Sequence, residues 1–427
     1  MDDLARALTG RLLLPADSDY ARAKLAFLTW YDNRRPAAIA LCESVADVQR
    51  CVEFAATQGI PVAARSGGHS YAGYSTPEGG LIIDVSRLDT VEVREDGTVV
   101  VGGGALLAGV FEAVGRAGRM MSAGTCPTVG VAGLTLGGGI GALGRKCGLA
   151  SDQLVAATLV TADGVLRTVS DTREPELFWA LRGGGGGNFG VVTSFTFRTI
   201  PAEPLTVWWL DYTTDTQPAI LDAWQSWQAD VPEEMWSQCR LGMPEGVAQI
   251  GGCLVGTDTS DIDDLARRIG ARPRERVQRE LDFLDTMRCF AEGNGERVAF
   301  ASMSRMLTGP MDPQAMAELV TSEPRMWCLI DSFGGAIARG EGAFPHRDAI
   351  ASIQVTNRAD TVEQASRELA PVRDQLGQWF GANGFVNYID PELPDWRRAY
   401  YGESLPRLEA VARKYDPDRV FAFPQGI

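Results

Sequence analysis

Clusters of glycine constrain the fold of this chain more than any other feature. They occupy three segments, residues 65–71, 124–148 and 182–190. Glycine adopts left-handed backbone conformations at little cost and lets the main chain come close to a ligand or to another segment. We therefore expect loops in which the backbone turns sharply or approaches a bound group, connected by short helices and strands.

The first two glycine-rich segments each contain a reactive side chain. His69, one of only two histidines in the chain, lies in Arg65-Ser66-Gly67-Gly68-His69-Ser70-Tyr71, and Cys126 lies in Gly124-Thr125-Cys126-Pro127-Thr128-Val129-Gly130. An imidazole and a thiolate are the side chains that most readily attach to an oxidised isoalloxazine ring. The pair predicts a flavin held by two covalent bonds. Considered singly, a histidine beside glycines can be a turn residue, and a cysteine can be a small apolar core residue.

Two further patterns bear on phosphate binding. Ser66 to Ser70 offers consecutive backbone N–H groups to a pyrophosphate, and Arg65 adds a positive charge. Residues 139–144 match G-x-G-x-x-G, and Asp163 follows about 20 residues later, as in a dinucleotide-binding domain. Gly148 interrupts the helix that such a domain requires, and the motif lies far from the first strand. We therefore reject a Rossmann domain.

Composition excludes several classes of protein. A length of 427 residues suggests two or three domains, and the net charge of -15 argues against nucleic acid or an anionic membrane as a partner. The acidic start, Met1 to Ala5, and the lack of any run of about 18 apolar residues predict neither a secretory signal nor a transmembrane helix. The eight cysteines are scattered without a Cys-x-x-Cys pair, so we expect no metal site, reduced thiols and a cytoplasmic location.

Local patterns predict a mixed helix and sheet domain at the N-terminus. A helix is expected between Ser44, a capping residue, and Gly59. Asp96-Gly97 and Asp163-Gly164 each lie between apolar runs that predict β-hairpins. Further elements are expected as strands at 81–85 and 191–197 and as helices at 105–114 and after Pro175.

Composition changes after the segment Pro201-Ala202-Glu203-Pro204, which predicts a domain boundary. We expect a cofactor domain over residues 1–202, a substrate domain over 203–384, and an aromatic C-terminal segment, 385–427, that returns to the first domain. The substrate domain is expected to be a sheet covered by helices. Its expected strands are 207–212, 247–255, 327–333 and 351–355, and its expected helices are 218–228, 262–269 and 363–380.

Several of these motifs, in this order, resemble those of berberine bridge enzyme-like flavin oxidases, in the wider vanillyl-alcohol oxidase and p-cresol methylhydroxylase group. The matching segments span nearly the whole chain: residues 65–70, 126–141, 187–193, 387–390, 396–402 and 416–427. The resemblance implies an α+β fold, with a two-part FAD-binding domain of the p-cresol methylhydroxylase type and a substrate domain of antiparallel sheet covered by helices.

The resemblance also implies a set of site residues. His69 would carry FAD through its 8α-methyl group, and Cys126 would carry it through carbon 6 of the ring. Tyr388, in Asn387-Tyr388, would be the catalytic base, and a small residue at Val129 goes with access for O2. The other cofactor-binding residues implied are Arg65, Ser66, Gly67, Gly68, Ser70, Thr128, Val129, Gly130, Gly133, Gly138, Gly139, Gly190, Val192 and Asn387.

Three residues leave alternatives open. Tyr388 can instead be a packing residue, with Asp390 or a residue of the substrate domain as the base, because an unperturbed tyrosine has a pKa near 10. Phe385 stands where many relatives carry tyrosine. The stretch around His346 resembles one that recurs in bacterial members of this family, and His346 is expected to be structural or pocket-lining.

The activity implied is that of a bicovalent FAD oxidase. Its substrate would be a small molecule, such as the alcohol of a natural product in secondary metabolism. The enzyme would reduce O2 to H2O2. The alternatives are a carbohydrate oxidase acting at the anomeric carbon, a dehydrogenase that uses a non-oxygen acceptor, and a flavin-binding protein without enzymatic activity. The sequence gives no indication of oligomeric state.

Overall fold

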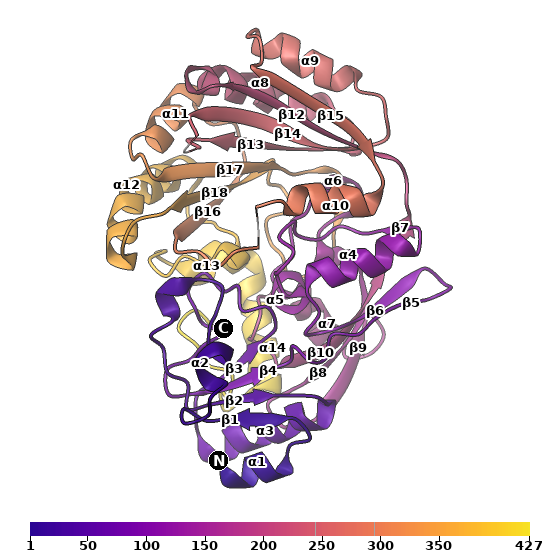
Figure 1. The fold of residues 1–427 in the computed structure, drawn as a ribbon, viewed down its shortest axis with the longest axis vertical. Helices are drawn as coiled ribbons and strands as arrows, with labels where there is room; N and C mark the ends of the chain where they lie inside the picture. Colours follow the sequence, from indigo (N-terminus) through magenta and orange to yellow (C-terminus); the bar gives the residue numbers. More distant parts are fainter. Residues whose placement is uncertain (244, 294) are drawn as a thin grey trace.

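Two parts, each built on β-sheets, are stacked along the long axis of the molecule (Figure 1). The computed structural model describes residues 1–243, 245–293 and 295–427. The lower part in Figure 1 contains both chain termini, a four-stranded and a five-stranded sheet and a two-stranded ribbon, and the upper part contains a seven-stranded sheet. None of the helices in these described ranges is long and apolar enough to cross a membrane.

A four-stranded sheet forms the base of the lower part. Its strands have the order β1-β2-β4-β3, with β2, β4 and β3 parallel and β1 antiparallel to β2. Helix α3 (Val45–Gln58) packs beside it and begins where the sequence predicts. The Ser44 side chain accepts from the backbone of Asp47 in a capping box, and Gly59 ends the helix in the left-handed region at φ +61. The strand bounds are β1 (Arg11–Leu13), β2 (Ala38–Leu41), β3 (Val62–Arg65) and β4 (Leu81–Asp84).

A five-stranded antiparallel sheet lies beside the first, with the order β5-β6-β10-β8-β9. Both predicted hairpins are confirmed, because β5 pairs with β6 across Asp96-Gly97 and β8 pairs with β9 across Asp163-Gly164. A two-stranded ribbon joins β7 to β11. The bounds are β5 (Val91–Val93), β6 (Thr98–Gly102), β7 (Arg119–Met120), β8 (Leu154–Val160), β9 (Leu166–Ser170), β10 (Val191–Arg198) and β11 (Ile200–Pro201).

Short helices connect these strands. The predicted helices after residue 105 and after Pro175 are α4 and α7. The glycine-rich segment 124–148 contains only two short helices, α5 and α6, separated by loop. The bounds of the helices in this part are α1 (Asp2–Ala7), α2 (Tyr20–Ala23), α4 (Leu107–Arg116), α5 (Val131–Leu136), α6 (Gly144–Cys147) and α7 (Pro175–Leu181).

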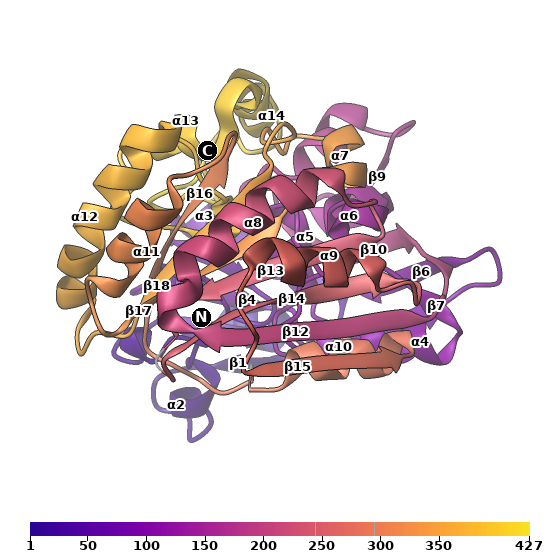
Figure 2. The ribbon, with the colours of Figure 1, turned by 90° about the horizontal axis from the view of Figure 1, so that it is seen from above.

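The upper part is one antiparallel sheet with the order β15-β12-β14-β13-β17-β18-β16. Figure 2 shows α8 and α9 lying across its outer face. This is the antiparallel sheet covered by helices that was expected. Its strands are β12 (Leu205–Thr213), β13 (Met235–Leu241), β14 (Val247–Val255), β15 (Glu275–Leu281), β16 (Ala301–Leu307), β17 (Met326–Ser332) and β18 (Ala351–Asn357); its helices are α8 (Gln217–Asp230), α9 (Ser260–Ile269), α10 (Phe283–Ala291), α11 (Pro313–Thr321) and α12 (Val362–Phe380).

Side chains alternate between the two faces of this sheet. In β18, Ile353 and Val355 belong to the apolar core under the helices, whereas Gln354 and Thr356 face the opposite way and line a cavity. In β17, Cys328 and Ile330 likewise belong to the core. The inner face of the sheet therefore presents a separate set of side chains toward the lower part.

The C-terminal segment packs against the lower part. Helices α13 (Trp396–Tyr401) and α14 (Leu405–Tyr415) follow the last turn of the upper part. The Arg407 guanidinium makes two hydrogen bonds of 2.8 Å to the carboxylate of Glu176 in α7, and the Tyr415 hydroxyl donates to Glu174 at 2.5 Å. The chain ends beside the lower sheets, where the Ile427 N–H donates to the Asn188 side chain at 3.0 Å.

Candidate active site

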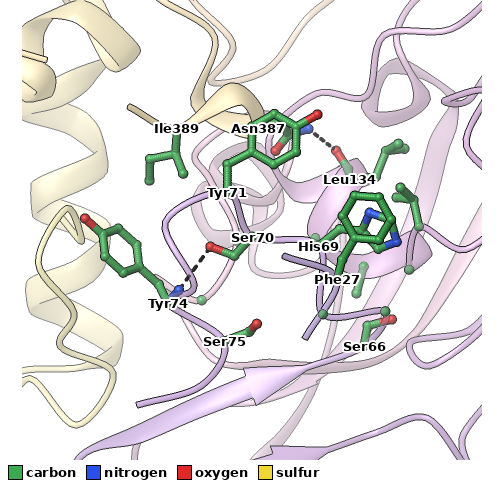
Figure 3. Close-up of a pocket in the computed structure, with 18 of the residues that line it drawn as sticks. Phe27, Ser66, His69, Ser70, Tyr71, Tyr74, Ser75, Leu134, Asn387 and Ile389 are labelled. Carbon is green, nitrogen blue, oxygen red and sulfur yellow. Dashed lines mark hydrogen bonds between the residues drawn. The ribbon is translucent and has the colours of Figure 1, made fainter. Parts of the chain in front are cut away.

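A cavity of about 450 Å³ lies between the two parts, and residues of both line it. Figure 3 shows its floor, which the loop from Ser66 to Ser75 forms. Gly67 and Gly130 bring two glycine-rich loops together here. A Cβ atom on Gly67 would lie 2.4 Å from the backbone nitrogen of Gly130. Glycine is therefore required for the loops to meet at this distance.

His69 lies on this cavity with its ring held on two sides. The Phe27 ring stacks on the imidazole, with ring centroids 3.9 Å apart (Figure 3). The Nε2 atom of His69 lies 3.0 Å from the Thr128 hydroxyl oxygen. Burial lowers the pKa of His69 to about 4, against the opposing effect of a hydrogen bond to the backbone of Thr128. The imidazole is therefore neutral at pH 7, as a nucleophile must be.

Cys126 lines the same cavity, in a turn that also contains Thr128. The Val129 N–H donates to the Cys126 carbonyl at 3.3 Å and closes the turn. The turn is anchored to α4, because Leu107 N–H donates to the Val129 carbonyl at 3.0 Å. The Cys126 Sγ atom lies 3.6 Å from the Thr128 hydroxyl oxygen. Thr128 thus contacts both predicted attachment residues.

Arg65 has a different environment from the one its position in the motif suggests. Its guanidinium is buried and forms an ion pair of 2.8 Å with the Asp84 carboxylate. It also donates to the backbone carbonyls of Ala23 and Lys24. Its positive charge is therefore compensated within the protein. A pyrophosphate bound here would depend mainly on backbone N–H groups of the loop.

Tyr388 lies in a short 3-10 turn, Val386–Tyr388, that is tied down at both ends. Phe385 N–H donates to the Ser304 hydroxyl at 2.8 Å, and the Asn387 side chain donates to the Leu134 carbonyl at 2.9 Å (Figure 3). At the far end, Arg373 bonds to both oxygens of the Asp390 carboxylate, at 2.8 and 3.1 Å. Asp390 is 3% exposed, so its carboxylate is engaged away from the cavity.

The Tyr388 side chain lies among aromatic rings. Its ring stacks parallel to Tyr71 with centroids 5.9 Å apart, and the Phe385 ring meets it edge-on at 5.0 Å. Phe385 therefore contributes packing where a tyrosine would contribute a hydroxyl. Burial raises the pKa of Tyr388 well above its ordinary value, and the negative charge of Asp331 raises it further. Tyr388 is accordingly a neutral phenol at pH 7.

Asp331, at the end of β17, is a titratable group that sequence reasoning missed. It is 4% exposed, and burial raises its pKa to about 6, while a hydrogen bond of 2.7 Å from Gln238 and the charge of Arg240 lower it. Asp331 and Tyr388 therefore form a pair of neighbouring buried acids whose pKa values differ widely.

Other cavity residues missed by sequence reasoning come from the same sheet face. Trp327 and Leu329 of β17 and Gln354 and Thr356 of β18 line the cavity. The Gln354 amide donates to the Tyr71 hydroxyl at 3.2 Å. The alternation of apolar and polar residues within β18 was the available signal, but it does not reveal which face meets a cavity, and β17 begins with five apolar residues in succession.

The structure places most of the predicted site residues on one cavity. Thr128 does not line it but contacts two residues that do, and Gly138, Gly139 and His346 lie elsewhere. Those that line it are Arg65, Ser66, Gly67, Gly68, His69, Ser70, Cys126, Val129, Gly130, Gly133, Gly190, Val192, Asn387 and Tyr388.

The cavity fits an extended, polar and aromatic cofactor such as FAD. Its volume lies in the range of cofactor sites. Two buried polar atoms on its wall, Ser75 Oγ and Gln425 Oε1, have no hydrogen-bond partner within the described ranges. A Cβ atom added to Gly133 would meet no protein atom within 4 Å, so the cavity reaches its backbone. Hydroxyl and phosphate groups of FAD can satisfy such donors and acceptors.

Comparison with known families assigns the cofactor and the lineage. A family described as "FAD binding domain" matches residues 36–170, and a family described as "Berberine and berberine like" matches residues 384–427. These two matches contain His69, Cys126 and Tyr388. The lower part of the molecule is therefore an FAD-binding domain.

Individual proteins resemble the chain over nearly its full length. It is 39% identical to (R)-6-hydroxynicotine oxidase of Paenarthrobacter nicotinovorans, over 97% of this chain and 96% of that protein. It is 29% identical to chitooligosaccharide oxidase of Gibberella zeae, over 92% of this chain and 87% of that protein. The solved structure of BBE-like 1 of Physcomitrella patens superimposes with a TM-score of 0.93 at 29% identity, covering 100% of this chain and 98% of that one.

Proposed function

Because the chain belongs to the berberine bridge enzyme-like family of FAD-linked oxidoreductases, we propose that it is an oxidase that carries FAD on both His69 and Cys126. We propose further that it oxidises an alcohol carbon of a natural product. The observation that carries the proposal is that His69, Cys126 and Tyr388 line one cavity between the two parts. Two attachment groups and a proton-transferring group there suit hydride removal from a bound substrate.

Residues of the lower part would hold the cofactor. Backbone N–H groups from Ser66 to Ser70 would bind the pyrophosphate, and the Gly130 and Gly190 loops would line the rest. When bound, FAD supplies the hydride acceptor and passes the electrons to O2, which gives H2O2. Val129, which lines the cavity beside Cys126, leaves space for O2. We also propose that the domain bounds are 1–202, 203–384 and 385–427.

Tyr388 would move the substrate proton although its own pKa is high. As hydride leaves the carbon, the substrate hydroxyl becomes strongly acidic, so its proton can pass to a neutral phenol that releases its own proton at the same time. Asp331 is the neighbouring carboxylate, and with a pKa of about 6 it is ionised at pH 7. We propose that Tyr388 acts as a relay and that Asp331, whose charge affects the pKa of Tyr388, receives the proton through a bridging group.

A carbohydrate oxidase acting at the anomeric carbon is the second candidate. Chitooligosaccharide oxidase is similar to the chain in sequence, and the sheet face offers an indole, an amide and a hydroxyl at Trp327, Gln354 and Thr356. Such a set can pack against one face of a sugar and bond to its hydroxyl groups. Peroxide release from natural-product alcohols and from oligosaccharides would separate the two candidates. Oxygen consumption would separate both from a dehydrogenase with another acceptor.

Mass spectrometry of the denatured protein tests the attachment. We expect one FAD per chain, and after digestion one adduct that links the peptides containing His69 and Cys126. In His69→Ala the adduct should remain on Cys126 alone, and in Cys126→Ala on His69 alone. An unmodified mass for protein expressed with ample flavin would contradict covalent attachment at either residue.

A further inference from the structure

Thr128 occupies a position between the two attachment residues. Its hydroxyl oxygen lies 3.0 Å from His69 Nε2 and 3.6 Å from Cys126 Sγ. The turn that carries it is fixed by two backbone hydrogen bonds to α4, from Leu107 N–H to the Val129 carbonyl and from Ala108 N–H to the Pro127 carbonyl, at 3.0 and 3.1 Å. The backbone of the turn therefore places the Thr128 side chain next to both His69 and Cys126.

A hydroxyl group between an imidazole and a thiol can donate a hydrogen bond to only one of them at a time, because it has a single proton. If it donates to the sulfur, its oxygen accepts from Nε2–H of the imidazole. That arrangement places the histidine proton on Nε2 and leaves a lone pair on Nδ1. It also stabilises a thiolate on Cys126, since an ionised acceptor makes the stronger hydrogen bond. Both side chains then have their nucleophilic form at the same time.

We propose that Thr128 is the positioning residue for flavin attachment: its hydroxyl accepts from His69 Nε2–H, donates to Cys126 Sγ, and so activates both residues together. This inference rests on the covalent attachment proposed above and concerns how that attachment is formed. The low pKa of His69, about 4, agrees with a neutral ring that has one proton to place.

The two bond-forming steps balance with O2 as the oxidant. At His69, an N–C bond forms to the 8α carbon, one C–H bond of that methyl group breaks, and the electron pair passes to the ring and then to O2. The imidazole proton leaves through the Thr128 hydroxyl. At Cys126, an S–C bond forms to carbon 6, its C–H bond breaks, and a second electron pair follows the same route. Each attachment reduces one O2 to H2O2.

The test compares full-length proteins purified from the same host. Thr128→Val removes the hydroxyl and keeps the shape, Thr128→Ser keeps the hydroxyl, and Thr135→Val is the matched control. Thr135 is a buried threonine of α5 in the same glycine-rich segment, and its hydroxyl has no partner among the residues that the structure describes. The readout is the fraction of His69 and Cys126 peptides that carry FAD after denaturation and digestion.

We expect Thr128→Val to lower the attached fraction at both residues at least tenfold, and Thr128→Ser and Thr135→Val to match the wild type. Rescue by serine, which restores the hydroxyl but not the methyl group, is the result that a purely structural role would not give. If the valine variant does not fold, Thr128→Ala removes the same hydroxyl without adding a methyl group.

Each other outcome has one meaning. Full attachment at both residues in Thr128→Val would overturn the proposal, and so would loss at only one residue, because the proposal joins the two. Loss in Thr128→Ser equal to that in Thr128→Val would assign the effect to packing. Absence of an adduct in the wild type would instead contradict the proposed covalent function, and it would be visible before any variant is compared.

Discussion

At the scale of single residues, the site combines a phenol that holds its proton with a carboxyl group that releases one near neutral pH. Burial raises the pKa of both Tyr388 and Asp331, but the two remain far apart. Neighbouring acids with separated pKa values are typical of catalytic pairs, in which one donates while the other is ionised. In the proposed reaction, this difference would let a tyrosine with a raised pKa pass on a proton that the carboxylate then holds.

Tyr388→Phe should slow flavin reduction by substrate about 100-fold or more, the usual contribution of a proton-transferring side chain. The phenylalanine keeps the stacking on Tyr71 but cannot take a proton. Anaerobic stopped-flow absorbance measures the rate, and the adduct mass should be unchanged. Reduction at the wild-type rate would exclude Tyr388 from proton transfer.

The rate of flavin reduction should depend on the ionisation of Asp331. Because its pKa is about 6 in the folded protein, we expect the rate to rise as the pH increases through 6 and to level off above 7. Asp331→Asn should be slower at every pH and should lack this rise. A wild-type profile in the asparagine variant would assign the pH dependence to the substrate or to another group.

At the scale of elements, local chemistry was readable from the sequence and strand pairing was not. The helix α3, both hairpins and the loops of His69 and Cys126 depend on caps, turns and glycines within a few residues. By contrast, Asp331 and Tyr388 come together through non-local contacts, because β17 and β16 both pair with β18, and the Tyr388 turn bonds to Ser304 of β16. Strands β13, β15 and β16 were not predicted. Strand β15 is a largely exposed edge strand without an apolar alternation, whereas β13 and β16 are mostly buried but contain polar residues among the apolar ones.

The ion pair between α12 and the Tyr388 turn should stabilise the protein more than a surface pair does. Arg373 and Asp390 are 9% and 4% exposed at their side chains, whereas Arg407 and Glu176 are 48% and 53% exposed. Arg373→Met leaves a buried carboxylate without its partner and should lower the free energy of unfolding by about 3 kcal/mol. Arg407→Met should cost less than about 1 kcal/mol.

Chemical denaturation of the FAD-loaded proteins measures both changes. Arg373→Met should also slow flavin reduction, because the turn that carries Tyr388 loses its anchor at Asp390, whereas Arg407→Met should not. Equal losses of stability in the two variants would show that burial of the Arg373 pair has no added effect.

At the scale of the whole molecule, buried polar contacts connect the upper part to the lower one. The Arg347 guanidinium bonds to both oxygens of Asp152, each at 2.7 Å, across a long separation in sequence. Arg145 of α6 donates to the carbonyls of Phe333 and Val231, at 2.6 and 3.1 Å. The Gln354 amide adds a contact at the cavity itself, where it donates to the Tyr71 hydroxyl, two residues from His69. The cavity therefore depends on the fit of the two parts, which no local sequence pattern reveals.

Burial of His346 predicts how the stability of the molecule responds to acid. Burial lowers the pKa of His346 to about 4, from an ordinary value of 6.5. Between these values the unfolded chain binds a proton that the folded chain does not, so the contribution to stability is complete above pH 6.5 and is lost as the pH falls toward 4. For this one side chain the loss between pH 7 and pH 5 is about 2 kcal/mol.

Asp331 has the opposite sign, because its folded pKa is raised to about 6. Ionised Asp331 destabilises the folded protein above pH 6, and this destabilisation diminishes as the pH falls from 6 to 4. The contribution of Asp331 is the same in the wild type and in a His346 variant. His346→Gln cannot be protonated, so its free energy of unfolding should fall by about 2 kcal/mol less than that of the wild type between pH 7 and pH 5. Denaturant titrations of both proteins at the two pH values measure this difference directly. An identical loss in both would mean that His346 is protonated as readily in the folded protein as in the unfolded chain.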